Sequence, residues 1–445
     1  MQHILERNTV STQEKILFWG IMIPMLVMDW NFSRPGFTIP LFLSYPGLIA
    51  GILLPLFFLA NKHFNLSLPA LKTFNRYHFI VLCLVIVFII QGLFYPAAWA
   101  TYGRDNWIEV IGLLLCFQSG YLYAVNPDVG ERLFSRFALY AAYGSVFSFC
   151  LRVAGVSDSL PFGVAGWPMR LFFLFGFCWY LCWYLAGFMS GKKTSRSILV
   201  GLIACSLEVV ITLQKPIIWA AFFSMATLFL IFRAFLPGRK FGKFKTKLVK
   251  LSVAVVLVLV VINNIFHEVV VDDISTFISV RILHQSDEVN DITLDRAAGG
   301  RFEVWETALK DFKRSPWVGI GLNSVHEGGG GASISLHNGY LDLLSILGIS
   351  GLTLFLYGIW YWLWRVVKSL KFKPLLLVQT SCLIYFVGIL MFNMGGTSRI
   401  FPGVSYFIAM VFGISLRLAV YANSHRRKYS PDNIRRGKLE KEIAF

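Results

Sequence analysis

The sequence predicts an all-α membrane protein with about twelve transmembrane helices and one large external loop. Of its 445 residues, 56% are hydrophobic, 16% are aromatic and only 15% are charged, and the mean hydropathy is +0.64. The apolar residues form long runs, and most basic residues lie in the connections between those runs. These three observations exclude a water-soluble globular protein.

A membrane-spanning helix needs about 20 mostly apolar residues. Twelve such stretches begin near positions 15, 41, 77, 106, 133, 168, 196, 217, 248, 338, 375 and 401. The first stretch lacks the small-residue cleavage site of a signal peptide, so we expect it to remain as a span. The predicted organisation is therefore nine spans over residues 1–266, an external loop over 267–337, three spans over 338–422 and a basic cytoplasmic tail over 423–445.

The distribution of lysine and arginine predicts which ends of the spans face the cytoplasm. If both termini are cytoplasmic, the inner segments contain 28 of the 41 Lys and Arg residues. The short outer turns then contain only six of them: Arg34, Arg104, Arg152, Arg170, Lys215 and Arg399. This asymmetry follows the positive-inside rule. Topology and anionic lipid headgroups account for the formal net charge of +17, so we expect no nucleic-acid partner.

The external loop is acidic and contains one predicted amphipathic helix. Residues 267–337 contain eleven Asp and Glu against six Lys and Arg. Within the loop, residues 301–314 ("RFEVWETALKDFKR") place four apolar side chains on one face of a helix. Ser315-Pro316 is expected to end this helix, "VGIGLN" to form a turn, and the four glycines at 328–331 to form a mobile link.

His337 and Asn338 lie where the glycine-rich segment changes into an apolar stretch. Ser333 or Ser335 is a candidate cap for a helix whose apolar body begins around Tyr340. The positive end of a helix dipole disfavours imidazolium, so a histidine in the first turn tends to stay neutral and able to accept a proton. Such a histidine suits a general base. The alternative is an interfacial histidine that only hydrogen-bonds lipid headgroups.

Several cations are predicted on the same outer face as His337. Lys215 lies in a very short turn between two apolar stretches, and Arg301 begins the amphipathic helix. Arg104, Arg170 and Arg399 lie at three further outer boundaries. An anionic lipid-linked substrate in the outer leaflet would meet these cations. Ordinary extension of each side chain into the headgroup region is the alternative.

The cysteines and carboxylates do not form a pattern typical of a metal or redox site. The cysteines all fall in apolar stretches without metal-ligand spacing, so we expect small core residues. Glu208, seven residues before Lys215 and expected on the same side of one helix, favours a structural ion pair or hydrogen bond. Asp272-Asp273 and Asp287-Glu288 favour a solvated acidic loop over a cation site. We therefore expect neither a metal nor a cofactor.

The loop and the following span together resemble the O-antigen ligase and polymerase superfamily of bacterial membrane glycosyltransferases. The resemblance lies in "GRFEVWETALKDFKRSPWVGIGLNS" followed by "HNGYLDLL". Its parts are an Arg-x-x-x-Trp helix, a Pro-x-x-Gly-x-Gly turn and a His-Asn pair: Arg301 with Trp305, Pro316 with Gly319 and Gly321, and His337-Asn338. Twelve spans with a large loop after the ninth are also similar to the family.

The resemblance implies a GT-C-like fold and an inverting, metal-independent glycosyl transfer from an undecaprenyl-diphosphate-linked glycan. It implies that His337 is the base and that Arg301 binds the diphosphate. Lys215 lies where many ligases have arginine, so the charge is kept but the bidentate fork is lost. Ile346 stands where ligases often have a carboxylate. Four further residues are expected to contact the substrate: Arg399, Arg170, Arg104 and Asn338.

The predicted function is the polymerisation of O-antigen or exopolysaccharide repeat units at the periplasmic face of the bacterial inner membrane. Its expected partners are the lipid-linked donor, a glycan acceptor, the bilayer and a chain-length regulator. An O-antigen ligase, which transfers glycan to lipid A-core, is the close alternative, and a protein glycan transferase is the third. A transporter of polysaccharide or lipid-linked sugar is disfavoured because the chain shows no repeated halves. A scaffold would not explain the combination of His337, Arg301 and Lys215.

Overall fold

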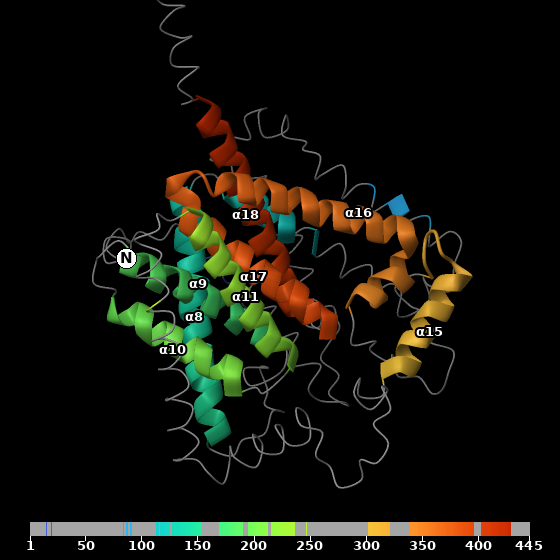
Figure 1. Ribbon diagram of the computed structural model, residues 1–445, viewed down its shortest axis with the longest axis horizontal. Helices are drawn as coiled ribbons and strands as arrows, with labels where there is room; N and C mark the ends of the chain where they lie inside the picture. Colours follow the sequence, from blue (N-terminus) through green and yellow to red (C-terminus); the bar gives the residue numbers. More distant parts are fainter. Residues whose placement is uncertain are drawn as a thin grey trace, which may run out of the picture.

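The computed structural model describes residues 113–114, 116–124, 127–153, 169–189, 195–211, 215–235, 301–320, 339–395 and 402–428, with a few single positions. This part of the chain is 94% helical and contains no strand. The all-α fold class is therefore confirmed for the described residues. The element bounds are α8 Pro127–Val153, α9 Met169–Met189, α10 Arg196–Ile211, α11 Lys215–Phe235, α15 Arg301–Arg314, α16 Gly339–Ser369, the 3-10 turn η4 Lys373–Leu375, α17 Leu376–Gly395 and α18 Pro402–Lys428 (Figure 1).

Five of the described helices are long and apolar enough to cross a membrane: α9, α11, α16, α17 and α18. They coincide with the predicted spans that begin near 168, 217, 338, 375 and 401. Helices α8 and α10 coincide with the predicted spans near 133 and 196, although α10 has only 16 residues. The predicted span near 106 is described in part, as helical residues 113–114 and 116–123, and the predicted spans near 15, 41, 77 and 248 lie outside the described ranges except for single positions. The protein is a multi-pass membrane protein.

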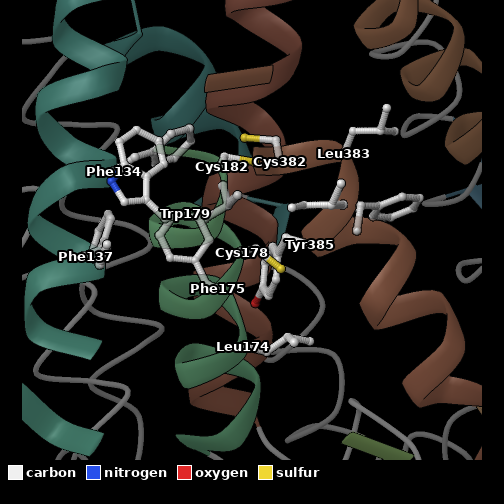
Figure 2. Packing of buried hydrophobic residues seen from close by; sticks show 14 of the residues in the cluster. Phe134, Phe137, Leu174, Phe175, Cys178, Trp179, Cys182, Cys382, Leu383 and Tyr385 are labelled. Atoms are coloured by element: carbon white, nitrogen blue, oxygen red, sulfur yellow. The ribbon is translucent and has the colours of Figure 1, made fainter. Parts of the chain in front are cut away.

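Helix α9 forms the centre of the described bundle, because it packs against α8, α10, α11 and α17. Its first turns, Leu171–Phe175, are at most 1% exposed. Aromatic rings from three other helices meet α9 edge to face: Phe134 of α8, Tyr385 of α17 and Phe407 of α18 all contact Phe175 at ring-centroid separations of 5.2–5.6 Å. Figure 2 shows Phe134 and Tyr385 around this part of α9. Such edge contacts give each ring a preferred orientation and so fix the relative positions of the helices.

The contacts between helices show that the chain reverses direction from one helix to the next. The added Cβ of Gly176 in α9 would lie 2.7 Å from Ala141 of α8, and that of Gly144 in α8 would lie 3.0 Å from Phe173 of α9. A step forward along α8 is thus a step back along α9. By the same reasoning, α9 and α17 are antiparallel, as are α11 and α17. This alternation is what a chain threaded repeatedly through a membrane requires.

Glu208 forms a structural hydrogen bond, as the sequence predicts. It is 1% exposed, and its Oε1 accepts a 2.9 Å hydrogen bond from the hydroxyl of Ser148 on α8. The expectation that Glu208 and Lys215 share one helix is wrong. Helix α10 ends at Ile211 and α11 begins at Lys215, so the intervening turn separates the two residues.

The cysteines follow the expectation with two exceptions, one of which is the partly buried Cys83. Five of them, Cys116, Cys178, Cys182, Cys205 and Cys382, are buried free thiols. Cys150, near the end of α8, is exposed. The sequence could not separate it from the others, because a helix in an apolar stretch has both a protein-facing and an outward-facing side.

Candidate active site

The loop helix α15 is anchored to the bundle by a break in α16. Helix α16 is interrupted at Gly348, whose φ is 61° and ψ is −169°. Residues 316–320, which follow α15, run along this break. The N–H of Ile320 donates to the carbonyl of Ser345 at 2.9 Å, and the N–H groups of Ile349 and Ser350 donate to the carbonyls of Pro316 at 2.8 Å and Trp317 at 3.1 Å.

These hydrogen bonds satisfy groups that the break would leave without helical partners. The last carbonyls of a helical segment and the first N–H groups of the next one have no intrahelical partner. Here the turn after α15 supplies three of the missing partners. The Ser350 hydroxyl also donates to the carbonyl of Trp317. We call this contact between residues 316–320 and 345–350 the α15–α16 junction.

Two glycines make the junction possible. Gly319 has a φ of 72°, and its missing Cβ would collide with the backbone carbonyl of Ile346. A Cβ on Gly348 would lie 2.5 Å from the backbone nitrogen of Gly319 and 2.6 Å from the carbonyl of Trp317. The backbone conformation of Gly348 is one that essentially only glycine adopts. Gly319, the first glycine of the Pro-x-x-Gly-x-Gly turn, thus permits the backbone after α15 to pack directly against the backbone of α16.

The junction is also the place where two helical segments end. Helix α15 ends at the junction, and so does the first segment of α16, Gly339–Leu347. Both elements pack against each other, and Figure 1 shows α15 beside the bent end of α16. Arg301 and Gly339 are the residues at which these two segments begin. The sequence predicts α15 with its bounds, but it does not predict that α16 is broken.

The start of α16 rests on the end of α17. The hydroxyl of Tyr340 donates to the carbonyl of Leu390 at 3.0 Å. A Cβ on Gly339 would lie 3.2 Å from the side chain of Asn393. In the sequence, His337-Asn338 come immediately before Gly339, and Arg399 comes shortly after the end of α17. The described contacts thus bring together the start of α16, which follows His337-Asn338, and the end of α17, which precedes Arg399.

The start of α11 lies at the same level of α17. The Ser224 hydroxyl donates to the carbonyl of Ile384 at 2.8 Å. A Cβ on Gly388 would lie 3.3 Å from the carbonyl of Ala220. Because the two helices are antiparallel with equal rise per residue, moving back from Ala220 to Lys215 corresponds to moving forward from Gly388 to Asn393. The backbone of Lys215 therefore lies level with Asn393.

Arg170 approaches this level from α9. Its side chain is only 4% exposed. One turn further along α9, Leu174 lies 3.0 Å from where a Cβ on Gly388 would be. Antiparallel packing therefore puts Arg170 level with Phe392, which is next to Asn393. A buried guanidinium needs hydrogen-bonding or anionic partners, so its location at this end of the bundle distinguishes Arg170 from an arginine in open headgroup.

Three helices thus begin at the level of Asn393, near the end of α17: α9 next to Arg170, α11 at Lys215 and α16 at Gly339. The structure describes the backbone of Lys215 and Arg301, whereas His337, Asn338, Arg399 and Arg104 lie outside the described residues. Within the described ranges, no group of three His, Cys, Asp or Glu residues is arranged to hold a metal ion.

Sequence reasoning missed Tyr340, Asn393 and Gly348. Tyr340 directly follows the His-Asn pair, and Asn393 is a single polar residue near the end of an apolar stretch. For Tyr340 and Asn393, these positions in the sequence were the only signal of a role, and the signal was weak. Their packing partners are about 50 residues or more away or in another element, so periodicity within one helix could not reveal them.

The sequence of this region also matches a known protein family. Residues 169–356 match the family described as O-antigen ligase, a range that begins at α9 and includes both sides of the α15–α16 junction. No curated protein matches the sequence significantly. The family implies membrane glycosyl transfer of ligase or polymerase type with lipid-linked glycan substrates. Over residues 169–356, the chain is thus similar to the O-antigen ligase and polymerase superfamily.

Proposed function

We propose that the protein polymerises lipid-linked repeat units of O-antigen or exopolysaccharide by inverting, metal-independent glycosyl transfer. The observation that carries the proposal is the meeting of Arg170, the start of α11 and the start of α16 at one end of α17. These positions are far apart in the sequence. A site that uses several elements together gives a reason for bringing basic residues to the level of the helix start that the His-Asn pair precedes in the sequence.

In the proposed reaction, His337 accepts the proton of an acceptor sugar hydroxyl. The acceptor oxygen forms a bond to the anomeric carbon of the donor sugar, while the bond from that carbon to the diphosphate oxygen breaks on the opposite face. The configuration is therefore inverted, and undecaprenyl diphosphate leaves with the bonding electrons. A hydroxyl is a poor nucleophile until a base removes its proton, which gives the histidine its role.

Fixed positive charge stabilises the leaving group. We assign Arg301 and Lys215 to the diphosphate, with Arg170, Arg399, Arg104 and Asn338 as further substrate contacts. Charge develops on the diphosphate as the glycosidic bond breaks, and preorganised cations in a poorly hydrated site stabilise that charge strongly. The burial of Arg170 supports this assignment, because a desolvated guanidinium interacts with an anion more strongly than a solvated one.

The membrane arrangement follows from the charge distribution. We place both termini in the cytoplasm and the site at the periplasmic face of the inner membrane. The starts of α9, α11 and α16 and the end of α17 are then periplasmic. A lipid-linked donor in the outer leaflet would present its diphosphate at this depth, and a chain-length regulator is a further expected partner.

An O-antigen ligase is the second candidate, favoured by the description of the matching family. Lys215, in place of the arginine found in many ligases, inclines the assignment toward a polymerase. Deletion of the gene separates the two. Surface glycan reduced to a single capped repeat indicates a polymerase, whereas long lipid-linked chains that remain unattached indicate a ligase.

Variants of the site residues test the chemistry. We expect His337→Ala, Arg301→Ala, Lys215→Ala and Arg170→Ala to reach the membrane but to lose glycan transfer, with a loss of about 10²–10⁴-fold for the base. The matched control is Lys310→Ala, which removes an exposed cation from the same helix as Arg301; Lys310 pairs only with Glu306 at the surface. Normal polymer yield and length in all four site variants would reject the proposal.

A further inference from the structure

We propose that Tyr340 is a positioning residue for the transfer reaction. Its hydroxyl bond to the Leu390 carbonyl fixes the start of α16 on the end of α17, and so sets where His337 meets the acceptor. The inference rests on the proposed role of His337 as the base. Neither the resemblance nor the family match assigns a role to Tyr340.

The contact joins the two segments that flank the proposed site. Tyr340 is half-buried between α16 and α17. Gly339 packs closely enough against Asn393 that even a methyl group would lie 3.2 Å from its side chain. A directional hydrogen bond and a close steric contact are thus among the contacts that hold the start of α16. Both contacts are within two residues of His337-Asn338.

The first segment of α16 is held at both of its ends. The α15–α16 junction fixes it beside Leu347, and the Tyr340 bond fixes it at its beginning, about two helical turns away. If the Tyr340 bond is removed, the junction still holds the segment, but its beginning is able to pivot. The displacement is then largest at the end that leads to His337.

A small displacement at this end has a large effect on the reaction. His337 is three residues from Tyr340, so the chain can separate their Cα atoms by at most about 11 Å. A general base must come within about 2.6–3.2 Å of the oxygen that it deprotonates. Misplacement of a reacting group by about 1 Å is enough to lower a rate by about 10²-fold.

The hydroxyl is not needed for folding of α17. A carbonyl oxygen has two lone pairs, and Leu390 lies in a helix whose regular hydrogen bonds reach the residues after it. Removal of the Tyr340 hydroxyl therefore leaves the Leu390 carbonyl with its helical partner. Tyr340→Phe consequently separates positioning from folding.

The test uses membranes that contain the full-length protein. The probe is the lipid-linked glycan extracted from a strain that lacks the gene. We expect Tyr340→Phe to lower kcat by about tenfold with an unchanged KM for the lipid-linked donor, because the cations that hold the diphosphate are intact. The matched control is Tyr357→Phe, the same change on an exposed tyrosine of the same helix, which should leave both constants unchanged.

Gly339→Ala provides a second route to the same displacement, because its methyl group would push the start of α16 away from Asn393. It should lower kcat in the same way. An unchanged kcat in Tyr340→Phe would overturn the proposal, as would a raised KM with unchanged kcat or a loss of membrane protein with normal specific activity. His337→Ala separates the two levels: full activity in that variant rejects the proposed function, whereas an inactive His337→Ala beside a normal Tyr340→Phe rejects this inference alone.

Discussion

Glu208 and Arg170 are both charged and buried, yet they lie in different parts of the bundle. Glu208 accepts a hydrogen bond from Ser148 between α8 and α10, whereas Arg170 lies at the end of the bundle where the proposed site residues meet. Burial by itself therefore does not identify a functional residue. The distinction comes from the neighbours: Glu208 is hydrogen-bonded between two helices inside the packing, and a substrate-binding cation lies where a substrate has access.

We expect Glu208→Ala to reduce stability without reducing catalysis. The change removes the acceptor of the buried Ser148 hydroxyl, and such a loss costs about 1–3 kcal/mol. Thermal unfolding of the purified protein in detergent should shift to lower temperature, while transfer activity per folded molecule stays normal. Glu208→Gln, which keeps an acceptor oxygen, should recover part of the loss. A catalytic defect at full stability would contradict the structural role.

At the scale of elements, the junction between α15 and α16 is what joins the external loop to the membrane bundle. It is made from backbone hydrogen bonds across a broken helix, with two glycines that allow the backbones to approach. Trp317 of the junction is 71% exposed, whereas Ile346 and Leu347 on the α16 side are buried. Helix α15 is therefore located by directional backbone bonds together with apolar contact at α16.

We expect Gly348→Ala to detach α15 from α16. The backbone conformation of Gly348 costs a non-glycine residue about 1–3 kcal/mol, and the new Cβ would lie 2.5 Å from the nitrogen of Gly319. Protease cleavage within residues 301–320 of the membrane-embedded protein should become faster. Ser350→Ala loses only the side-chain bond to Trp317 and keeps the backbone bond, so its effect should be smaller. Equal cleavage of Gly348→Ala and the parent protein would contradict the account.

At the scale of the whole molecule, the proposed site requires the starts of some helices and the end of another to lie on one side of the membrane. The starts of α9, α11 and α16 and the end of α17 are brought together because neighbouring helices alternate in direction. The opposite ends of these helices lead to the basic connections that the positive-inside rule assigns to the cytoplasm. The helix contacts bring these helix ends to one side, and the charge asymmetry predicts that this side is periplasmic.

We expect labelling of single cysteines to confirm this orientation. In a Cys150→Ser background, Gln214→Cys should react with a membrane-impermeant maleimide in spheroplasts, because residue 214 precedes α11 at its proposed outer end. Lys371→Cys, in the exposed turn between α16 and α17, should react only after permeabilisation. The reverse pattern would place the proposed site in the cytoplasm and contradict the proposed donor.

The sequence predicts more of the elements than of their contacts. It predicts α15 over residues 301–314 and the beginning of α16 around Tyr340, because a 3.6-residue periodicity and a change from polar to apolar composition are local signals. It did not predict the break at Gly348, because a single glycine in an apolar helix is compatible with an unbroken span. The packing around Asn393 was missed for a similar reason, since its partners lie on other helices.

By itself, the sequence determined that this protein is helical and membrane-spanning, which stretches form the described helices, and which superfamily its loop motif resembles. These properties follow from local composition and spacing, because the bilayer leaves a backbone few alternatives to the helix. Only the tertiary structure decided that Arg170, Lys215 and the start of α16 meet at one level of α17, and that α15 is held by a broken helix. The register between antiparallel helices depends on which glycines, serines and rings interlock, and no single segment contains that information.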